Sequence, residues 1–572
     1  MPGQGQATRE RPGDMSENHF GLTRRQVLAA GAVVGLAGGA RTAQAADAAA
    51  GQATARGSVL DAATGKGIAG VMVANGRDVV KTDAAGRWEL TVEDGQSVFV
   101  IKPPGWMTPV DPDTQLPRFA HVHAPNGSPA ALDFRFAGLA PTGALPESID
   151  FRLHRQAEPA RFSALLFTDP QPESLAEIGY VRDDVVAQSG GMDAAFGITH
   201  GDVMFDDLSF YERQNRIVGT IGLPWYNLPG NHDMNLEAPD NTHSRETFKR
   251  VFGARYAAFQ WGGVTFLTLD NVDYLGTDPS KPLGFGKYRG FFGDRQLAFV
   301  RNVLANVPTD SLVVVSFHIP LRTVMGTDAA VANVDTREFL AAIASHPRTV
   351  SFAGHTHTNE HWYLGAADGN PGQGEHHHHV LGAVSGSWWS GPFDERGIPV
   401  ALASDGSPNG FHLLEIDGNR YTTRLVGARE PECAPMRIVL DSQAHTGGPE
   451  LLQQYPVGAL LRGPIPRASA ASTRVVVNLF DGGPRSEVEL RIGRQGGFVP
   501  MRRTARTDPF VEEVYARNLA SKKPWVQPVK SPHIWQAALP ADLAAGTHRL
   551  TVRARDEYGR EVLGYMVLEV TA

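Results

Sequence analysis

The segment Gly230-Asn231-His232-Asp233 places two kinds of chemical group side by side. The Asn231 amide oxygen can bind a metal ion, and the His232 imidazole can donate or accept a proton near neutral pH. A four-residue match is weak evidence on its own. Its weight comes from further polar residues on both sides of it along the chain: Asp169, Gln171, Asp202, His318, His355 and His357.

These candidates share one position in the chain pattern. Each comes soon after an apolar segment that predicts a β-strand: 163–168, 194–199, 225–228, 312–317 and 349–353. In an open layered sheet, the carboxyl ends of parallel strands share one edge, and ligands bind there. Taken singly, an Asp or His after a strand is more often a turn residue or a helix cap. Only the ordered set predicts a shared site.

The donor atoms of this set suit two divalent cations. Carboxylate, imidazole and amide oxygen bind borderline or hard first-row metals, and the two oxygens of Asp202 could bridge a pair of ions. A pair of ions would lower the pKa of a shared water, generate hydroxide near neutrality and screen the negative oxygens of a phosphate. The expected cofactors are therefore two ions of Mn, Fe, Zn or Co.

The ordered motifs resemble the calcineurin-like metallophosphoesterase superfamily, whose pattern is D-x-H, GD, GNH[DE], a lone His after a strand, and GHxH. This chain has them as Asp169-Pro170-Gln171, Gly201-Asp202, Gly230-Asn231-His232-Asp233, His318 and Gly354-His355-Thr356-His357. The resemblance implies that Asp169 and His357 hold the first metal and that Asp202 bridges both. It implies that Asn231, His318 and His355 hold the second.

Gln171 departs from this pattern, because the family has His at that place. An amide oxygen is neutral and generally a weaker ligand than imidazole, so we expect a looser first metal or a preference for Mn²⁺ or Fe²⁺ over Zn²⁺. The residue type is compatible both with direct coordination and with a bond through water.

The resemblance gives His232 a different role from its neighbour. It implies that His232 protonates the leaving oxygen or steadies the transition state. Asp233 or Asp206 could hold the other ring nitrogen. The family's usual acidic residue falls three positions after the bridging Asp, where this chain has Phe205. The sequence therefore leaves the partner of His232 undecided.

Strands and amphipathic segments alternate over residues 150–430, which predicts an α/β layered domain. The family resemblance implies a sandwich of two sheets flanked by helices. By resemblance this is the phosphoesterase domain. One further strand is expected at 264–269, and helices are expected at 174–188, 208–221, 295–306 and 336–345.

β patterns flank this domain on both sides. Residues 53–140 resemble a transthyretin-like or carboxypeptidase-regulatory β-sandwich, for which we favour a packing role over ligand binding. Residues 432–572 predict a C-terminal β-sandwich, with strands at 473–479, 486–492, 548–554 and 562–570. The combination resembles a multidomain bacterial branch of the superfamily.

Length and composition limit the remaining possibilities. A chain of 572 residues is too long for one ordinary core. Acidic residues exceed basic ones by 61 to 53, so we expect no nucleic-acid partner and no general attraction to anionic membranes, although metals can hold an anion locally. Cys433 is the only cysteine, which excludes an intrachain disulfide and a thiolate metal cluster.

Residues 1–45 have the pattern of an export signal. Arg24 and Arg25 precede a weakly hydrophobic run, and Ala43-Gln44-Ala45 forms an A-x-A cleavage pattern. This resembles a twin-arginine signal peptide and predicts a periplasmic or secreted protein without a stable membrane span after cleavage. A basic tail or an uncleaved anchor is the alternative.

Two aromatic segments carry weaker signals. For the four histidines at 376–379 we favour a loop or strand start beside the pocket, without a role as core ligands. Trp388 and Trp389 would face opposite sides of a strand, and we slightly favour both being buried. An exposed Trp near the metals would favour a sugar or another flat substrate group.

The function that these features predict is an exported dinuclear metal-dependent phosphoesterase. Metal-bridged hydroxide would attack a phosphomonoester or phosphodiester of a small molecule or glycan. The alternative is an envelope phosphoglycan-binding protein with a degenerate metal centre, for which Gln171 is the best support and His232 the main difficulty. The sequence does not choose among monoester, diester and pyrophosphate, nor does it fix the oligomeric state.

Overall fold

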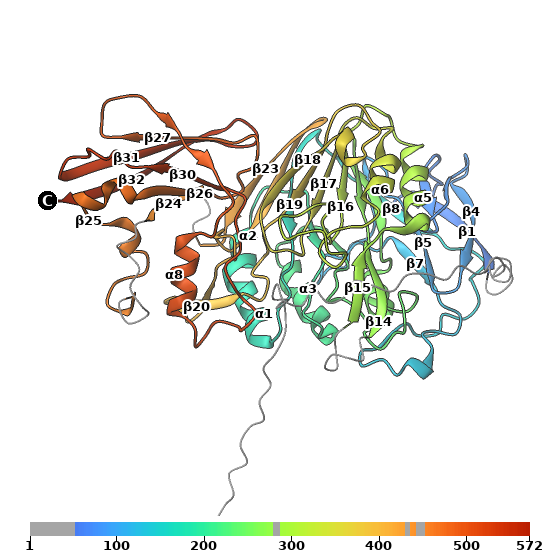
Figure 1. Ribbon diagram of the computed structural model, residues 1–572. Helices are drawn as coiled ribbons and strands as arrows, with labels where there is room; N and C mark the ends of the chain where they lie inside the picture. Colours follow the sequence, from blue (N-terminus) through green and yellow to red (C-terminus); the bar gives the residue numbers. More distant parts are fainter. Residues whose placement is uncertain (1–51, 278–285, 430–434, 442–451) are drawn as a thin grey trace, which may run out of the picture.

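The computed structural model describes residues 52–277, 286–429, 435–441 and 452–572 (Figure 1). The expected leader at residues 1–45 and Cys433 lie outside them. Three β-rich regions follow one another along the chain, coloured blue, green to yellow, and orange to red in Figure 1. No helix in the described part of the chain is both long and apolar enough to cross a membrane.

The first region is a sandwich of two small sheets. One has the order β4 (Arg87–Glu93), β1 (Gln52–Asp61), β8 (Phe151–Arg155), β6 (Trp106–Met107), and the other β3 (Val79–Lys81), β2 (Met72–Ala74), β5 (Gln96–Val100), β7 (Ala120–His123). In β4, Trp88, Leu90 and Val92 alternate with exposed residues and point into the core. β8 pairs in parallel with β1, so the chain returns to this sandwich before it enters the next region.

Two larger sheets form the middle region. One has the order β11 (Trp225–Leu228), β10 (Phe196–His200), β9 (Arg161–Phe167), β22 (Gly410–Asp417), β23 (Arg420–Gly427). The other has the order β12 (Ala257–Trp261), β13 (Val264–Thr268), β16 (Val313–Ser316), β17 (Thr349–Ala353), β19 (His376–Val380), β18 (Glu360–Leu364). Residues such as Leu166, Ile198, Phe266 and Phe352 fill the core between them. All six strands expected here are present.

Helices cover the outer faces of both sheets. On the first lie α1 (Leu175–Val181), the π-helical turn η2 (Arg182–Val186), α2 (Ala187–Ser189), and η3 (Leu208–Phe210) with α3 (Tyr211–Gly219). On the second lie α5 (Gly293–Leu304) and α6 (Thr336–Ile343), whose Phe299 and Phe339 pack against Val313 and Val315. The expected fold class, an α/β layered sandwich with flanking β-domains, is confirmed.

Shorter elements complete the first and middle regions. They are η1 (Ala130–Leu132), α4 (Glu246–Phe252), η4 (Ala366–Asp368), the hairpin of β14 (Val272–Thr277) with β15 (Gly286–Gly290), and the pair β20 (Trp389–Phe393) and β21 (Pro399–Ala401).

The four histidines form the start of a strand, which is one of the two placements expected for them, and not a loop. Residues 376–379 lie in strand β19 between β17 and β18, and all four are buried. His376 and His378 face the helix side, where Ser351 Oγ bonds both rings at 2.8 Å. His377 and His379 face the core between the sheets. Hydrogen-bonded partners make this polar strand compatible with a buried position.

The last region is a second β-sandwich with one helix beside it. Its sheets have the orders β24 (Met436–Asp441), β26 (Arg474–Leu479), β30 (Ile534–Ala538), β29 (Arg502–Arg503), and β25 (Ile465–Pro466), β32 (Glu561–Thr571), β31 (Gly546–Arg555), β27 (Glu487–Ile492), β28 (Val499–Pro500). The connections contain η6 (Leu460–Arg462), η7 (Arg467–Ser472) and α8 (Pro509–Arg517). The sequence predicted four of these strands but not α8.

Buried polar contacts join the last region to the middle one. His533 Nε2 lies 2.9 Å from Asp405 Oδ2, and its Nδ1 lies 2.7 Å from Asn478 Oδ1. All three side chains are buried. Since an unpaired buried charge is costly, this network fixes how the two regions fit together.

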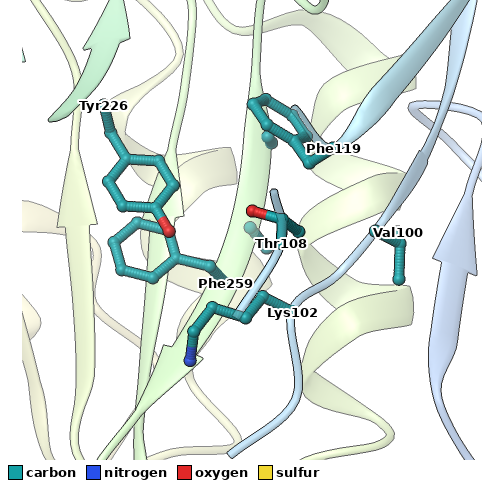
Figure 2. A pocket seen from close by; sticks show the side chains of 8 residues that line it. Val100, Lys102, Thr108, Phe119, Tyr226 and Phe259 are labelled. Atoms are coloured by element: carbon teal, nitrogen blue, oxygen red, sulfur yellow. The ribbon is translucent and has the colours of Figure 1, made fainter. Parts of the chain in front are cut away.

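A small pocket lies where the first region contacts the middle one. Figure 2 shows Lys102 beside Thr108, Tyr226 and Phe259 in its lining. The Lys102 ammonium donates to Glu158 Oε1 at 2.5 Å and to the Gln260 carbonyl at 2.7 Å. The charge of Lys102 is therefore used in the contact between regions.

Candidate metal centre

The seven predicted ligands lie just beyond the carboxyl ends of five strands. Asp169 and Gln171 follow β9, Asp202 follows β10, and Asn231 follows β11; His318 follows β16, and His355 and His357 follow β17. The two sheets present these ends at one edge of the sandwich because β9, β10 and β11 are mutually parallel, as are β13, β16 and β17.

His318 is the centre of the group predicted to hold the second metal. Its Nε2 lies 3.0 Å from Asn231 Oδ1, 3.2 Å from Asp202 Oδ2 and 3.2 Å from His355 Nδ1. Atoms bound about 2.0–2.2 Å from one ion lie about 3.0–3.4 Å apart in tetrahedral or octahedral arrangements. The three distances from His318 Nε2 are therefore compatible with one shared cation.

The tautomers of the two imidazoles support the same assignment. His318 Nδ1 lies 2.9 Å from the His200 carbonyl, and His355 Nε2 lies 2.8 Å from the Ala330 carbonyl. A carbonyl oxygen only accepts hydrogen bonds, so these two nitrogens carry the protons. Burial opposes a charged ring, but Asp202 and Asp169 outweigh it and raise the pKa of His318 to about 9, so without a metal Nε2 also carries a proton. A bound cation would take the place of that proton.

The group predicted for the first metal is also buried. His357 Nε2 lies 3.5 Å from Asp169 Oδ1. Gln171 donates from Nε2 to the Gly386 carbonyl at 3.1 Å, which leaves its buried Oε1 without a partner among the described residues. A buried acceptor without a donor is costly. The orphaned oxygen therefore fits a metal that Asp169, Gln171 and His357 would share.

The backbone at these residues adopts an uncommon conformation. Asp169, Gln171, Asp202, His355 and His357 all have positive φ. Such strain persists where the surrounding structure enforces it, and it concentrates at functional sites.

The motif glycines have a steric reason at two positions. A Cβ at Gly230 would lie 2.0 Å from Asp202 Oδ1, and one at Gly354 would lie 2.2 Å from Asp169 Oδ2. Only glycine lets these turns approach the carboxylates so closely.

Asp206 is the partner of His232 that the sequence left undecided. Its Oδ1 lies 2.9 Å from His232 Nδ1, while the His232 backbone N–H donates to Asp202 Oδ1 at 2.9 Å. Asp233 instead accepts from the Gly230 and Val203 backbones and from the Tyr211 hydroxyl. The ring is thus held at Nδ1, and Nε2 is left for proton transfer.

Asp206→Asn is expected to shift the pH dependence of turnover. Burial opposes a charged ring, but Asp206 and Asp202 outweigh it and raise the pKa of His232 to about 10. An acid is lost as pH rises through its pKa, so removing the Asp206 charge should move the basic limb of the kcat profile to lower pH. A basic limb at the same pH in Asp206→Asn would contradict the assignment.

Gln171→Ala is expected to weaken the first metal while leaving the second in place. We expect an affinity loss of about 10- to 100-fold, since one neutral ligand and its orientation by Gly386 are removed. Titration with a competing chelator measures the loss. Gln171→His is the matched variant and should bind Zn²⁺ more tightly. Wild-type affinity in Gln171→Ala would mean that the residue acts only through water.

Aromatic rings lie on two sides of the ligands. Trp388 is half-buried with its ring 4.9 Å from that of His357, whereas Trp389 is buried against Tyr180. The expectation that both are buried is therefore wrong. On the other side Phe205 stacks on His232 at 4.2 Å, and Trp525 of the last region stacks on Phe205 at 6.4 Å. No sequence motif marks Trp525, because only the folded C-terminal region brings it here.

Two family models match the chain. The model for the C terminal of calcineurin-like phosphoesterase matches residues 378–562, and the model for the N terminal of calcineurin-like phosphoesterase matches residues 53–139. Among solved structures, the purple acid phosphatase PPD1 from yellow lupin (Lupinus luteus) seeds is similar at 11% identity and a TM-score of 0.35, over 64% of this chain and 68% of that chain. No curated protein matches the chain.

Proposed function

We propose that this chain, which belongs to the calcineurin-like phosphoesterases and is a metal-dependent phosphoric ester hydrolase, acts on a phosphate ester with a flat alcohol group, such as an aryl or sugar ring. We also propose that it acts outside the cytoplasm. The substrate is a phosphorylated small molecule or glycan. Both monoester and diester hydrolysis are compatible with the proposed ligands.

One observation carries the hydrolytic part of this proposal. His318 Nε2 lies within 3.2 Å of donor atoms from Asn231, Asp202 and His355, and these come from separate strand ends. Next to this group, His232 is bonded both to Asp202 and to Asp206. Cation ligands and a proton-transfer residue are therefore adjacent, as the hydrolysis of a phosphate ester requires.

The proposed division of labour follows from these contacts. When bound, two divalent ions would supply an acidified water and stabilise the charge of the phosphate oxygens. Asp202 holds the His232 backbone with Oδ1 and faces His318 with Oδ2, so it links the ligands to the acid. Asp206 fixes the His232 ring, whose Nε2 would donate its proton to the departing alcohol oxygen.

Gln171 no longer favours the alternative of a binding protein. Its amide nitrogen is held by Gly386 and its oxygen is buried without a partner among the described residues. This arrangement supports a ligand role, which a degenerate centre would not need. The test is to load the full chain separately with Mn²⁺, Fe²⁺, Co²⁺ or Zn²⁺ and to assay phosphomonoesters and phosphodiesters. Turnover with none of the four ions would favour the binding protein.

The aromatic rings support a flat substrate group. Phe205 stacks on His232, the proposed proton donor to the alcohol, and Trp525 stacks on Phe205, which supports an aromatic contact for a flat alcohol group. Trp525→Ala is expected to raise KM for an aryl phosphate several-fold, about 1–2 kcal/mol of lost stacking, and to leave KM for a short alkyl phosphate unchanged. Equal effects on both substrates would contradict a specificity role.

Export is proposed on the paired arginines alone. Arg24 and Arg25 precede the weakly hydrophobic run of the leader, which resembles a twin-arginine signal. Fractionation of cells that express the full chain measures its location. Replacement of both arginines by lysine should retain the protein in the cytoplasm, and unchanged export would contradict this route.

A further inference from the structure

A second cluster of metal-binding side chains lies outside the catalytic site. His361 of β18, His379 of β19 and His412 of β22 converge on Asp481, which follows β26. The three imidazoles are fully buried, and the Asp481 side chain is 8% exposed. The cluster joins both sheets of the middle region to the last region, and it shares no residue with the predicted dinuclear site.

One nitrogen of each of the three rings lies near the same Asp481 oxygen, and the ligand atoms of His361, His379 and Asp481 all lie within 4.8 Å of one another. Asp481 Oδ1 lies 3.2 Å from His361 Nε2, 2.7 Å from His379 Nε2 and 3.3 Å from His412 Nε2. Atoms that bind a tetrahedral zinc at about 2.0–2.1 Å lie about 3.3 Å from one another. Small shifts of the side chains would therefore admit an ion among them.

His412 provides the independent sign that a ligand belongs here. Its ring is completely buried, yet neither nitrogen has a hydrogen-bond partner among the described residues. Buried polar atoms are normally paired, and an unpaired imidazole in a protein core is costly. His412 Nε2 lies 3.3 Å from Asp481 Oδ1 without forming a hydrogen bond, so a bound cation would satisfy it.

The outer ring nitrogens of His361 and His379 are held in the way that metal-binding histidines usually are. His361 Nδ1 lies 2.9 Å from His377 Nε2, and His377 Nδ1 lies 2.7 Å from the Tyr421 hydroxyl. His379 Nδ1 lies 3.4 Å from Thr423 Oγ1. A ligating imidazole donates its other N–H to such partners, which fix the tautomer and the ring orientation.

Asp481 is the one carboxylate among the histidines of this cluster. Burial would raise the pKa of Asp481, but His379 and His412 hold it well below its usual range, so the carboxylate is ionised. Burial lowers the pKa of His379 to about 3, whereas the hydrogen bond and charge of Asp481 outweigh burial at His361 and raise its pKa. In the described part of the chain, the ion pairs of Asp481 are all with histidines and not with Lys or Arg.

The turn that carries Asp481 is shaped for this approach. Asp481 has a positive φ of 63°, and Gly483 follows two residues later. A Cβ at Gly483 would lie 2.8 Å from His361 Cβ. Glycine therefore allows the turn of the last region to close over the histidines of the middle region.

We propose that His361, His379, His412 and Asp481 bind one structural Zn²⁺, which fastens the C-terminal β-sandwich to the phosphoesterase sandwich. Three imidazoles and one carboxylate fill the four positions of a tetrahedral site, as in structural zinc centres without an open position. Imidazole nitrogens suit Zn²⁺ better than Mg²⁺, Ca²⁺ or Mn²⁺. The protein would then hold a third ion that takes no part in hydrolysis.

Metal content of variants tests the proposal in the full chain. Asp169→Ala/Asp202→Ala/His318→Ala removes the predicted dinuclear site. Purified from zinc-supplemented cells and passed over chelating resin, this triple variant should retain about one zinc per chain. Adding Asp481→Asn and His379→Gln should reduce the zinc to less than about a tenth of that. The matched control adds His376→Gln, on the same strand but facing the helices, and should keep the zinc.

X-ray absorption at the zinc edge gives a second measurement that leaves the cluster intact. In the triple variant we expect four nitrogen or oxygen neighbours at about 2.0 Å with the scattering pattern of three imidazoles. A folded triple variant without zinc would overturn the proposal. So would a six-coordinate zinc, or zinc retained equally after Asp481→Asn and His379→Gln.

Discussion

Asp202→Ala is expected to lose its bound metals and all measurable phosphoesterase activity. The Asp202 carboxylate is buried, with Oδ2 3.2 Å from His318 Nε2 and Oδ1 2.9 Å from the His232 backbone nitrogen. Its removal takes away the proposed bridge and the anchor of the proton donor together. Without its two shared oxygens neither ion keeps a full set of ligands.

Elemental analysis and turnover should fall together in this variant. We expect dinuclear-site occupancy below about a tenth of wild type, and kcat/KM lower by at least about 10⁴-fold. Asp207→Ala is the matched control, because Asp207 lies in the same connection but is half-buried and caps η3. It should keep metal and activity. Full dinuclear occupancy in Asp202→Ala would contradict the bridging role.

The strand-end residues could be predicted from sequence because the signal is local. An apolar run followed by Asp169, Asp202 or His318 marks both the strand and the place where its side chain leaves the sheet. Parallel pairing then gathers these ends at one edge. The fold class followed from the same alternation of strands and helices.

The remaining features depend on contacts between distant segments. Asp206 and Asp233 are both acidic and close to His232 in sequence or space, and only the folded turn decides that Asp206 reaches the ring. The burial of the strand at 376–379 was not predicted, because four polar residues in a row do not alternate. Its burial depends on Ser351 and on the distant Asp481.

Trp525 and His412 show the same dependence on the C-terminal region. Trp525 lies near the site because it stacks on Phe205, which is more than 300 positions earlier in the chain. His412 lies within a strand whose pattern predicts only burial, and its unpaired ring is visible only beside Asp481. Periodicity places such residues in a core but does not identify their partners.

His232→Ala is expected to lower turnover by about 10²- to 10⁴-fold while metal content stays at the wild-type level. The ring bonds Asp206 through Nδ1, and its Nε2 is assigned to the departing oxygen rather than to a metal. The backbone N–H of His232 donates to Asp202 Oδ1, and alanine retains this bond. The ligands should therefore keep their positions, and the loss should fall on the chemical step.

The leaving group provides the sharpest check on this role. An alcohol that departs easily, such as nitrophenol, needs little protonation, whereas an alkyl alcohol needs much more. His232→Ala should therefore damage alkyl phosphate hydrolysis far more than nitrophenyl phosphate hydrolysis. His243→Ala, which removes a partly exposed histidine next to α4, is the control and should leave both rates unchanged. Equal losses on both esters would mean that His232 steadies the transition state without donating a proton. Unchanged rates would mean that His232 takes no part in hydrolysis.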